Sequence, residues 1–139
     1  MEIQDILGYM LNTSARFIKR KMDRELETYN LTTSQWAVIK LLDSKKELTQ
    51  AELADQLSGD RATAGTVIFN LIEKGYVEKK LKPGDRRSYV VSLTQKSRAI
   101  VKDIELKAEK ISELALKDID EHDTEIFFRA LKKIIENLS

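Results

Sequence analysis

Residues 60–93 decide the fold, and they read DRATAGTVIFNLIEKGYVEKKLKPGDRRSYVVSL. Asp60 is a favourable N-cap, and the spacing of the apolar residues after it predicts a helix over residues 61–74. Gly75 follows in the position that a left-handed C-cap prefers. Beyond Gly75 the pattern changes to a period of two, which predicts a strand at residues 76–81, a basic turn at residues 82–87 and a second strand at residues 88–93.

The rest of the chain has the pattern of helices. Their expected N-caps are Thr32, Thr49, Thr94 and Asp120. Gln35 and Glu52 stand three residues after the first two caps and complete capping boxes, and the short helix after the second box should end near Leu57. Amphipathic spacing predicts a long first helix from about residue 2 to residue 30. With one proline and five glycines in 139 residues, the fold class expected is mainly α within α+β.

The charge is distributed unevenly along the chain. Lys and Arg number 24 and Asp and Glu number 23, so the formal net charge is +1. Residues 61–98 nevertheless hold nine basic and three acidic residues, which gives this segment +6 and leaves −5 on the remainder. A basic middle segment between acidic helical ends is typical of a module that contacts a polyanion, although a solvated charged surface is the simpler interpretation of charge alone.

Composition excludes several classes of function. The chain has no cysteine, which excludes a disulfide framework, a thiolate metal site and a cysteine nucleophile, and one histidine argues against a zinc site. No glycine-rich phosphate loop or nucleophile-base constellation is present, so we expect neither an enzyme nor a bound metal or cofactor. No run reaches the ~20 apolar residues of a membrane span and the N-terminus lacks a signal peptide, so a cytoplasmic protein without membrane contact is expected.

The two short helices that meet at residues 58–60 form a helix-turn-helix candidate, and the hairpin after them makes it a winged one. The inward stripe expected for the second of these helices is Ala64, Val67, Ile68, Leu71 and Ile72. Its other side carries small and hydroxyl residues near the helix start, which allows a close approach to a major groove. The candidate DNA contacts there are Arg61, Thr63, Gly65, Thr66 and Asn70. An ordinary solvated helix face is the alternative.

The turn of the hairpin suits a minor groove. An arginine side chain is slender and responds to the negative potential of a narrow groove, so Arg87 is the candidate for insertion. Asp85 stands two residues earlier and can hold the guanidinium in one direction. The phosphate contacts expected around them are Lys79, Lys80, Lys82 and Arg86. A tight turn that merely happens to be charged is the competing interpretation.

The order and spacing of these motifs resemble the MarR family of bacterial winged-helix repressors over essentially the whole chain. The segments that carry the resemblance are residues 31–42, 48–57, 60–63, 71–77, 84–88 and 91–94. They include the wing signature Asp-x-Arg at Asp85 and Arg87. The resemblance implies an obligate homodimer in which residues 1–30 and 95–139 form the helical dimerisation region and residues 31–94 form the winged helix-turn-helix. It also implies an inverted-repeat operator, with recognition helices in successive major grooves and wings in the flanking minor grooves.

The terminal helices support dimerisation independently, because they carry more apolar side chains than one small winged domain can cover. These residues are Ile3, Ile6, Leu7, Met10, Ile126, Phe127, Leu131, Ile134 and Leu138. By the resemblance, a small aromatic or anionic effector would bind between the dimerisation helices and the winged region. The candidate pocket residues are Tyr9, Arg16, Phe17 and Trp36, although an aromatic on an apolar stripe is more often part of a core. His122 is expected on the surface.

Two classes of function therefore compete. The favoured one is a repressor that a small effector releases from double-stranded DNA. The alternative is a winged-helix module for protein interaction, in which the basic hairpin docks an acidic partner without specific DNA binding. The polar, small-residue face of the helix at 61–74 and the paired arginines of the turn disfavour this alternative.

Overall fold

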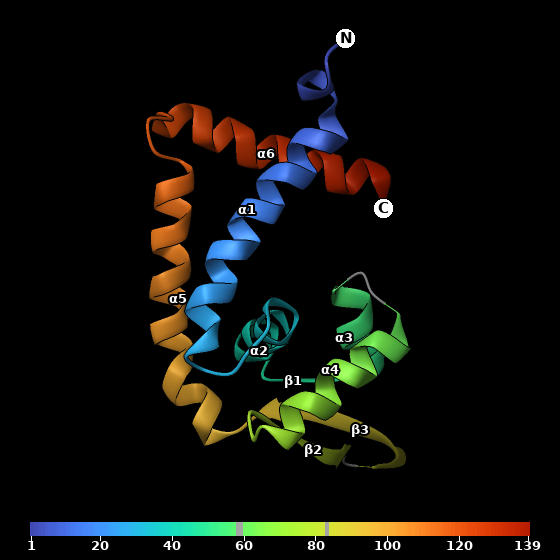
Figure 1. Cartoon of the computed structure of the whole chain (residues 1–139). Coiled ribbons are helices and arrows are strands. Elements are labelled where there is room, and N and C mark those ends of the chain that lie inside the picture. The colour runs from blue at the N-terminus through green and yellow to red at the C-terminus, as the bar shows by residue number, and fades with distance from the viewer. Residues whose placement is uncertain (58–59, 83) are drawn as a thin grey trace.

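The computed structural model describes residues 1–57, 60–82 and 84–139, and for residues 85–88 it describes the backbone alone. It is mainly helical with one small sheet (Figure 1). The elements are a 3₁₀ turn at Ile3–Asp5, α1 at Leu7–Glu27, α2 at Thr33–Lys45, β1 at Glu47–Thr49, α3 at Gln50–Gln56, α4 at Arg61–Glu73, β2 at Val77–Lys82, β3 at Asp85–Leu93, α5 at Gln95–Ala115 and α6 at Glu121–Leu138. The mainly α fold class and the winged helix-turn-helix order are thus confirmed.

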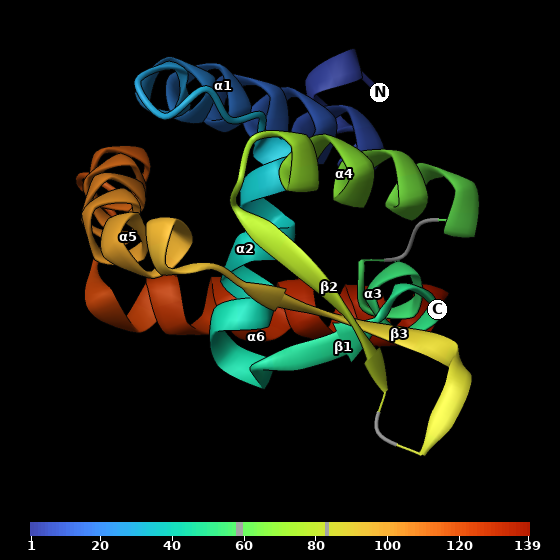
Figure 2. The same ribbon diagram turned by 90° about the horizontal axis from the view of Figure 1, so that it is seen from below.

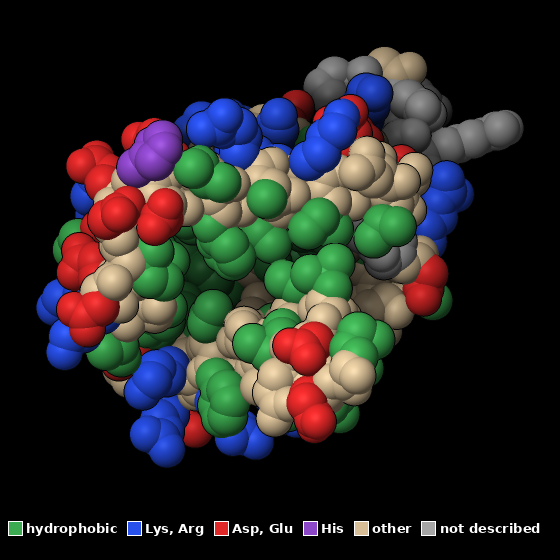
Figure 3. All heavy atoms as spheres, turned by 90° about the horizontal axis from the view of Figure 1, so that it is seen from above, with side chains coloured by type: hydrophobic (Ala, Val, Ile, Leu, Met, Phe, Trp, Pro, Cys, Tyr) green, Lys and Arg blue, Asp and Glu red, His purple; other side chains and the backbone are tan. Residues whose placement is uncertain are grey.

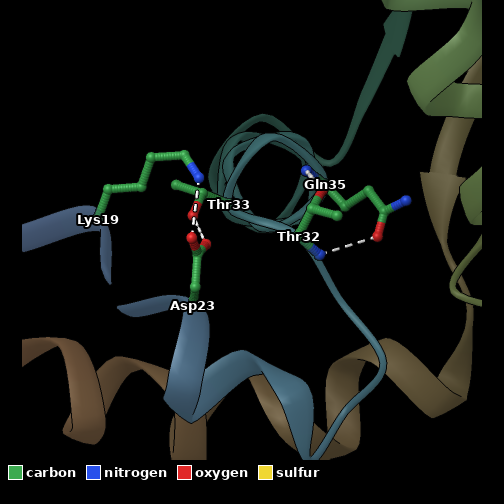
Figure 4. Close-up of polar contacts among 5 residues, drawn as sticks. All are labelled: Lys19, Asp23, Thr32, Thr33 and Gln35. Carbon is green, nitrogen blue, oxygen red and sulfur yellow. Dashed lines mark hydrogen bonds and ion pairs between the residues drawn. The ribbon is translucent and has the colours of Figure 1, made fainter. Parts of the chain in front are cut away.

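Most of the predicted helix caps are present. The Thr32 hydroxyl accepts from the Gln35 N–H at 3.2 Å and the Gln35 amide oxygen accepts from the Thr32 N–H at 3.0 Å (Figure 4). The capping box of Thr49 is formed in the same way, and side chains of Asp60 and Asp120 cap α4 and α6. Gly75 has φ +80° and ends α4 as predicted.

The junction of α1 and α2 is tied by side chains as well. Asp23 Oδ1 accepts from the Thr33 hydroxyl at 2.6 Å, and Lys19 Nζ lies 2.8 Å from Asp23 Oδ2 (Figure 4). These hydrogen bonds, first that from Lys19 and then that from Thr33, lower the pKa of the Asp23 carboxyl. The start of α2 is therefore anchored to the last turns of α1.

The sheet is antiparallel in the order β1-β3-β2. Leu48 of β1 and Lys79 of β2 both stand opposite Val91 of the central strand. The sequence did not predict β1, because three residues carry no periodic signal and they pair with a strand more than forty residues away. The strands of the wing also extend further into the predicted basic turn, since β2 ends at Lys82 and β3 begins at Asp85.

The core lies within the winged region and includes the last turns of α1 and the first half of α5. Its most deeply buried members are Leu26, Val38, Ile39, Leu42, Leu53, Leu71, Val91 and Ile104. The predicted inward stripe of α4 is confirmed, with Ala64, Ile68 and Leu71 buried. Because α4 packs through this stripe, its opposite side remains free to face a partner.

The predicted first helix is interrupted near its start. Glu2 and Asp5 form a capping box around a short 3₁₀ turn, and Ile6 has an extended backbone, so α1 begins at Leu7. The N-terminal half of α1 and all of α6 contribute no buried residue, although both carry apolar stripes. Hydrophobic side chains accordingly gather around a depression on the upper face of the molecule (Figure 3). Within the described residues, no helix has the length and apolar character needed to cross a membrane.

Candidate nucleic-acid interface

The outer side of α4 is polar and open to solvent. Arg61, Thr63, Thr66 and Asn70 are exposed, as the sequence predicted for DNA contacts. The Thr66 hydroxyl donates to the Ala62 carbonyl at 3.2 Å, so its free lone pairs remain available to accept. Phe69 lies on this side too and is 61% exposed. The geometry allows contacts to a groove, and the role of each residue stays a prediction.

Gly65 lies at the margin of this outer side. It is half-buried, and a Cβ added there would lie 2.9 Å from Nε2 of Gln50 in α3. The same Nε2 donates to the Arg61 carbonyl at 3.1 Å. Gly65 therefore faces the crossing of α3 and α4 rather than open solvent, and its contact with DNA stays a prediction. A glycine inside a helix lowers stability by up to ~1 kcal/mol relative to alanine. Its presence in α4 is therefore a sequence signal that another segment packs closely against the helix at this position.

The lysines of the wing divide between the two faces of the hairpin, because successive side chains of a strand alternate. Lys79 Nζ lies 4.8 Å from the centroid of the Tyr89 ring. Lys80 Nζ instead pairs with Glu78 Oε1 at 3.2 Å. Lys82 is exposed at the end of β2, beside a turn in which Gly84 has φ +83°. The sequence grouped these lysines as equal phosphate contacts, and the structure separates Lys79 from Lys80.

The predicted minor-groove residues lie at the tip of this wing. Asp85, Arg86 and Arg87 belong to β3 by their backbone, and their side chains lie outside the described residues. Figure 1 places α4 and the hairpin together along the lower edge of the molecule, and Figure 2 views that edge directly. The helix and the wing therefore face the same side, as a duplex would require.

A hollow of about 340 Å³ separates the start of α4 from the wing. It is lined by Thr49, Gln50, Ala51, Arg61, Lys79, Tyr89 and Val91. Its two charged members among the described residues, Arg61 and Lys79, are both cations. The nearby Asp60 carboxylate is engaged by the Thr63 N–H at 2.7 Å, and this hydrogen bond lowers the pKa of Asp60.

The other end of α4 is anchored to the connection between α1 and α2 and to the start of α2. Lys74 Nζ donates to the Asn30 carbonyl at 2.6 Å and to Gln35 Oε1 at 2.9 Å. The Tyr76 hydroxyl donates to the Tyr29 carbonyl, and burial raises the pKa of this phenol. Sequence reasoning missed these contacts, because a single lysine and tyrosine carry no signal of partners some forty residues away.

The predicted effector residues are not brought together in the chain. Trp36 is buried in the core, whereas Tyr9 and Phe17 are exposed on α1. The Arg16 guanidinium carbon lies 5.7 Å from the centroid of the Phe17 ring, so these two residues are neighbours. Trp36 thus belongs to the packing of the winged region rather than to a pocket with the other three. Among the described residues, no cluster of three or more His, Cys, Asp or Glu residues could hold a metal ion.

Comparison with known proteins gives consistent matches. The model of the MarR family matches residues 31–89. The chain is 30% identical over 130 residues to the uncharacterised HTH-type transcriptional regulator YwoH of Bacillus subtilis, and the match covers 94% of each chain.

Two solved structures with the same fold concern DNA binding. BpsR of Bordetella bronchiseptica, in a structure on the regulation of its DNA binding by 6-hydroxynicotinic acid, is 21% identical with a TM-score of 0.87, covering 96% of both chains. A mutant of MarR from E. coli complexed with operator DNA is 22% identical with a TM-score of 0.87, covering 96% of this chain and 99% of that one.

Proposed function

Given that the chain belongs to the MarR family of transcriptional regulators, which are not enzymes, we propose that it is a homodimeric repressor that binds an inverted-repeat operator. A small aromatic or anionic effector releases it. The observation that carries the proposal is the exposed polar side of α4 beside a basic wing on the same face of the molecule.

In this proposal α4 enters a major groove. Arg61, Thr63, Thr66 and Asn70 contact base edges or phosphates from its exposed side, and Gly65 keeps the backbone of α4 close to α3. The operator complex of the E. coli relative, which has the same fold, supports this placement.

The wing then reaches the neighbouring minor groove. Arg87 inserts into that groove and Asp85 orients it, while Lys79, Lys82 and Arg86 contact phosphates. Lys80 is left out of the phosphate contacts, because its ammonium pairs with Glu78 on the other face of the hairpin.

The dimer forms through residues 1–30 and 95–139, and residues 31–94 bind DNA. Apolar side chains of these terminal helices are exposed in the single chain: Ile3, Ile6, Leu7, Met10, Ile126, Phe127, Phe128, Ile135 and Leu138. They are about half exposed or more, so covering each contributes roughly 1 kcal/mol, which summed over two chains exceeds the cost of association. The hydrophobic depression of Figure 3 is the face that the partner would cover.

Release requires an effector that prefers the conformation unable to bind DNA. A coupling of about 1–3 kcal/mol would change operator affinity roughly 5–150-fold. Arg16 and Phe17 offer a cation and a ring side by side on α1, with Tyr9 two turns away, which suits an aromatic carboxylate in the assembled dimer. The effect of 6-hydroxynicotinic acid on BpsR supports this chemical class. Repression follows if the bound dimer excludes polymerase from the same duplex.

The decisive experiment is selection of bound sequences from a random duplex pool, followed by spacing variants of the selected site. Two identical recognition helices require half-sites about one helical turn apart, roughly 10 bp or 34 Å. Half a turn more would place one half-site on the opposite side of the duplex, so binding should fall ~10³-fold or more, to the non-specific level. Indifference to spacing, or full affinity for one half-site, would refute the symmetric dimer. Failure to retain any duplex at low salt would favour the protein-interaction module instead.

A further inference from the structure

The hollow beside the start of α4 lies where a strand of the duplex has to pass. Each sugar-phosphate strand of B-DNA is the boundary between a major groove and the neighbouring minor groove. If α4 occupies the first groove and the wing the second, the strand between those grooves must cross the protein surface between α4 and the wing. The hollow of about 340 Å³ is bounded by Arg61 of α4 on one side and by Lys79 and Tyr89 of the wing on the other.

The lining of the hollow suits a phosphate. Arg61 and Lys79 supply positive charge from opposite walls, and no described lining residue is a carboxylate. Lys79 extends along the Tyr89 ring, with its Nζ 4.8 Å from the ring centroid, so the ammonium is held toward the hollow. Lys80 is the adjacent residue on the other face of the strand and pairs with Glu78. Charge alone does not distinguish the two lysines, but the geometry does.

Gln50 fixes one wall of the hollow. Its side-chain amide donates to the Arg61 carbonyl at 3.1 Å and lies across Gly65, where a Cβ would come within 2.9 Å of Nε2. This bridge joins the first residue of α3 to the first residue of α4, so the position of the Arg61 backbone depends on it. A Cβ at position 65 would displace the Gln50 amide, so Gly65 leaves room for this bridge.

We propose that this hollow seats the sugar-phosphate strand between the two grooves, with Arg61 and Lys79 contacting its phosphates and Gln50 acting as the positioning residue for Arg61. The seat rests on the proposed function, since it presupposes that α4 and the wing bind one duplex. It adds that the two elements share a single strand, and that Lys79 rather than Lys80 belongs to the binding surface.

The first test compares Lys79→Ala with the matched variant Lys80→Ala across a salt series on the selected operator and on random duplex. Loss of one phosphate contact makes the negative slope of log K against log[salt] shallower by about 0.9. Between 50 and 200 mM salt, the factor by which Lys79→Ala loses affinity should therefore be about threefold smaller than the factor for wild type. Arg61→Ala should behave like Lys79→Ala, whereas Lys80→Ala should keep the wild-type slope. Equal slopes for Lys79→Ala and Lys80→Ala would overturn the seat.

The second test replaces single phosphates of the operator with neutral methylphosphonates. One phosphate between the major-groove and minor-groove contacts should weaken wild-type binding when neutralised, and the same replacement should have little effect on Lys79→Ala. A strand seated elsewhere would leave Lys79→Ala as sensitive as wild type at every position. If wild type binds no duplex at all, the proposed function fails together with the seat, whereas specific wild-type binding without this pattern refutes the seat alone.

The third test addresses the positioning role of Gln50. Gln50→Ala and Gly65→Ala should each reduce the loss of affinity that this one methylphosphonate causes. The double variant should show the same reduction as either single variant, because each substitution removes the same bridge. Gln56→Ala is the matched control for Gln50→Ala and should respond as wild type does, because Gln56 is an exposed glutamine at the end of the same helix. Additive losses, or a response to the methylphosphonate that stays as strong as in wild type, would show that Gln50 does not position Arg61.

Discussion

Lys74→Met should loosen the recognition helix from the rest of the molecule. Lys74 Nζ donates to the Asn30 carbonyl at 2.6 Å and to Gln35 Oε1 at 2.9 Å, which ties the end of α4 to the connection between α1 and α2. Methionine keeps the apolar stem and removes the ammonium. The variant therefore isolates the polar contacts from the packing of the side chain.

The magnitude follows from these two hydrogen bonds. A hydrogen bond to a charged group contributes about 1.5–3 kcal/mol when it is buried. Lys74 is half-buried, and after the change Gln35 Oε1 still accepts from the Thr32 N–H at 3.0 Å, while the Asn30 carbonyl belongs to an exposed residue that water can reach. We expect the free energy of unfolding to fall by about 2 kcal/mol for the pair, and the melting temperature by roughly 6–10 °C for a domain of this size.

The assay is thermal and urea unfolding at one fixed protein concentration, because the stability of a dimer depends on concentration. Lys45→Met, an exposed lysine in the last turn of α2, is the matched control and should change the free energy of unfolding by under ~0.5 kcal/mol. Operator affinity of Lys74→Met should also fall, since α4 loses an anchor. If Lys74→Met and Lys45→Met unfold alike, the contacts of Lys74 contribute nothing and the anchoring of α4 is wrong.

Three other predictions concern the surface and the α1–α2 junction. The pKa of Asp23 is lowered in the folded state, so its contribution to stability is present above the unfolded value of 3.8 and is lost as the pH falls through the folded value; Asp23→Asn should flatten the acid limb of a stability-pH curve, and an unchanged limb would contradict this. Arg87→Ala should weaken operator binding and relax the preference for A·T-rich flanks, whereas Lys82→Ala should weaken binding to all sequences alike; identical profiles on a panel of duplexes would show that the two roles are not distinct. Phe127→Ala removes an apolar ring that is 47% exposed, worth roughly 1 kcal/mol per copy, and should raise the dimer dissociation constant roughly 30-fold in sedimentation, while Phe69→Ala on α4 should leave it unchanged; a dimer equally tight in both variants would place the interface elsewhere.

Local features were predictable from the sequence because they depend on residues a few positions apart. The capping boxes at Thr32 and Thr49 each close over three residues, and the C-cap of Gly75 needs only a residue that tolerates positive φ. The change of period after Gly75 determined the hairpin, and the stripe of α4 determined which side is buried. The prediction of a polar helix face beside a basic hairpin followed from these local features and from the distribution of charge.

Individual side-chain roles depended on the tertiary structure. Gln50 meets Arg61 eleven positions away, and Lys74 meets Asn30 44 positions away, so no local spacing indicates either contact. Trp36 has the same apolar pattern whether it lines a pocket or a core, and packing placed it in the core. Lys79 and Lys80 are adjacent lysines that the sequence alone does not distinguish. In the structure they point to opposite faces of the strand, where Lys79 contacts Tyr89 and Lys80 pairs with Glu78. The sequence by itself determined most of the elements and their polarity, β1 and the break at Ile6 excepted, because these arise from short-range sterics and hydrogen bonds. The tertiary structure decided which residues share a site, because that requires chain segments far apart to meet.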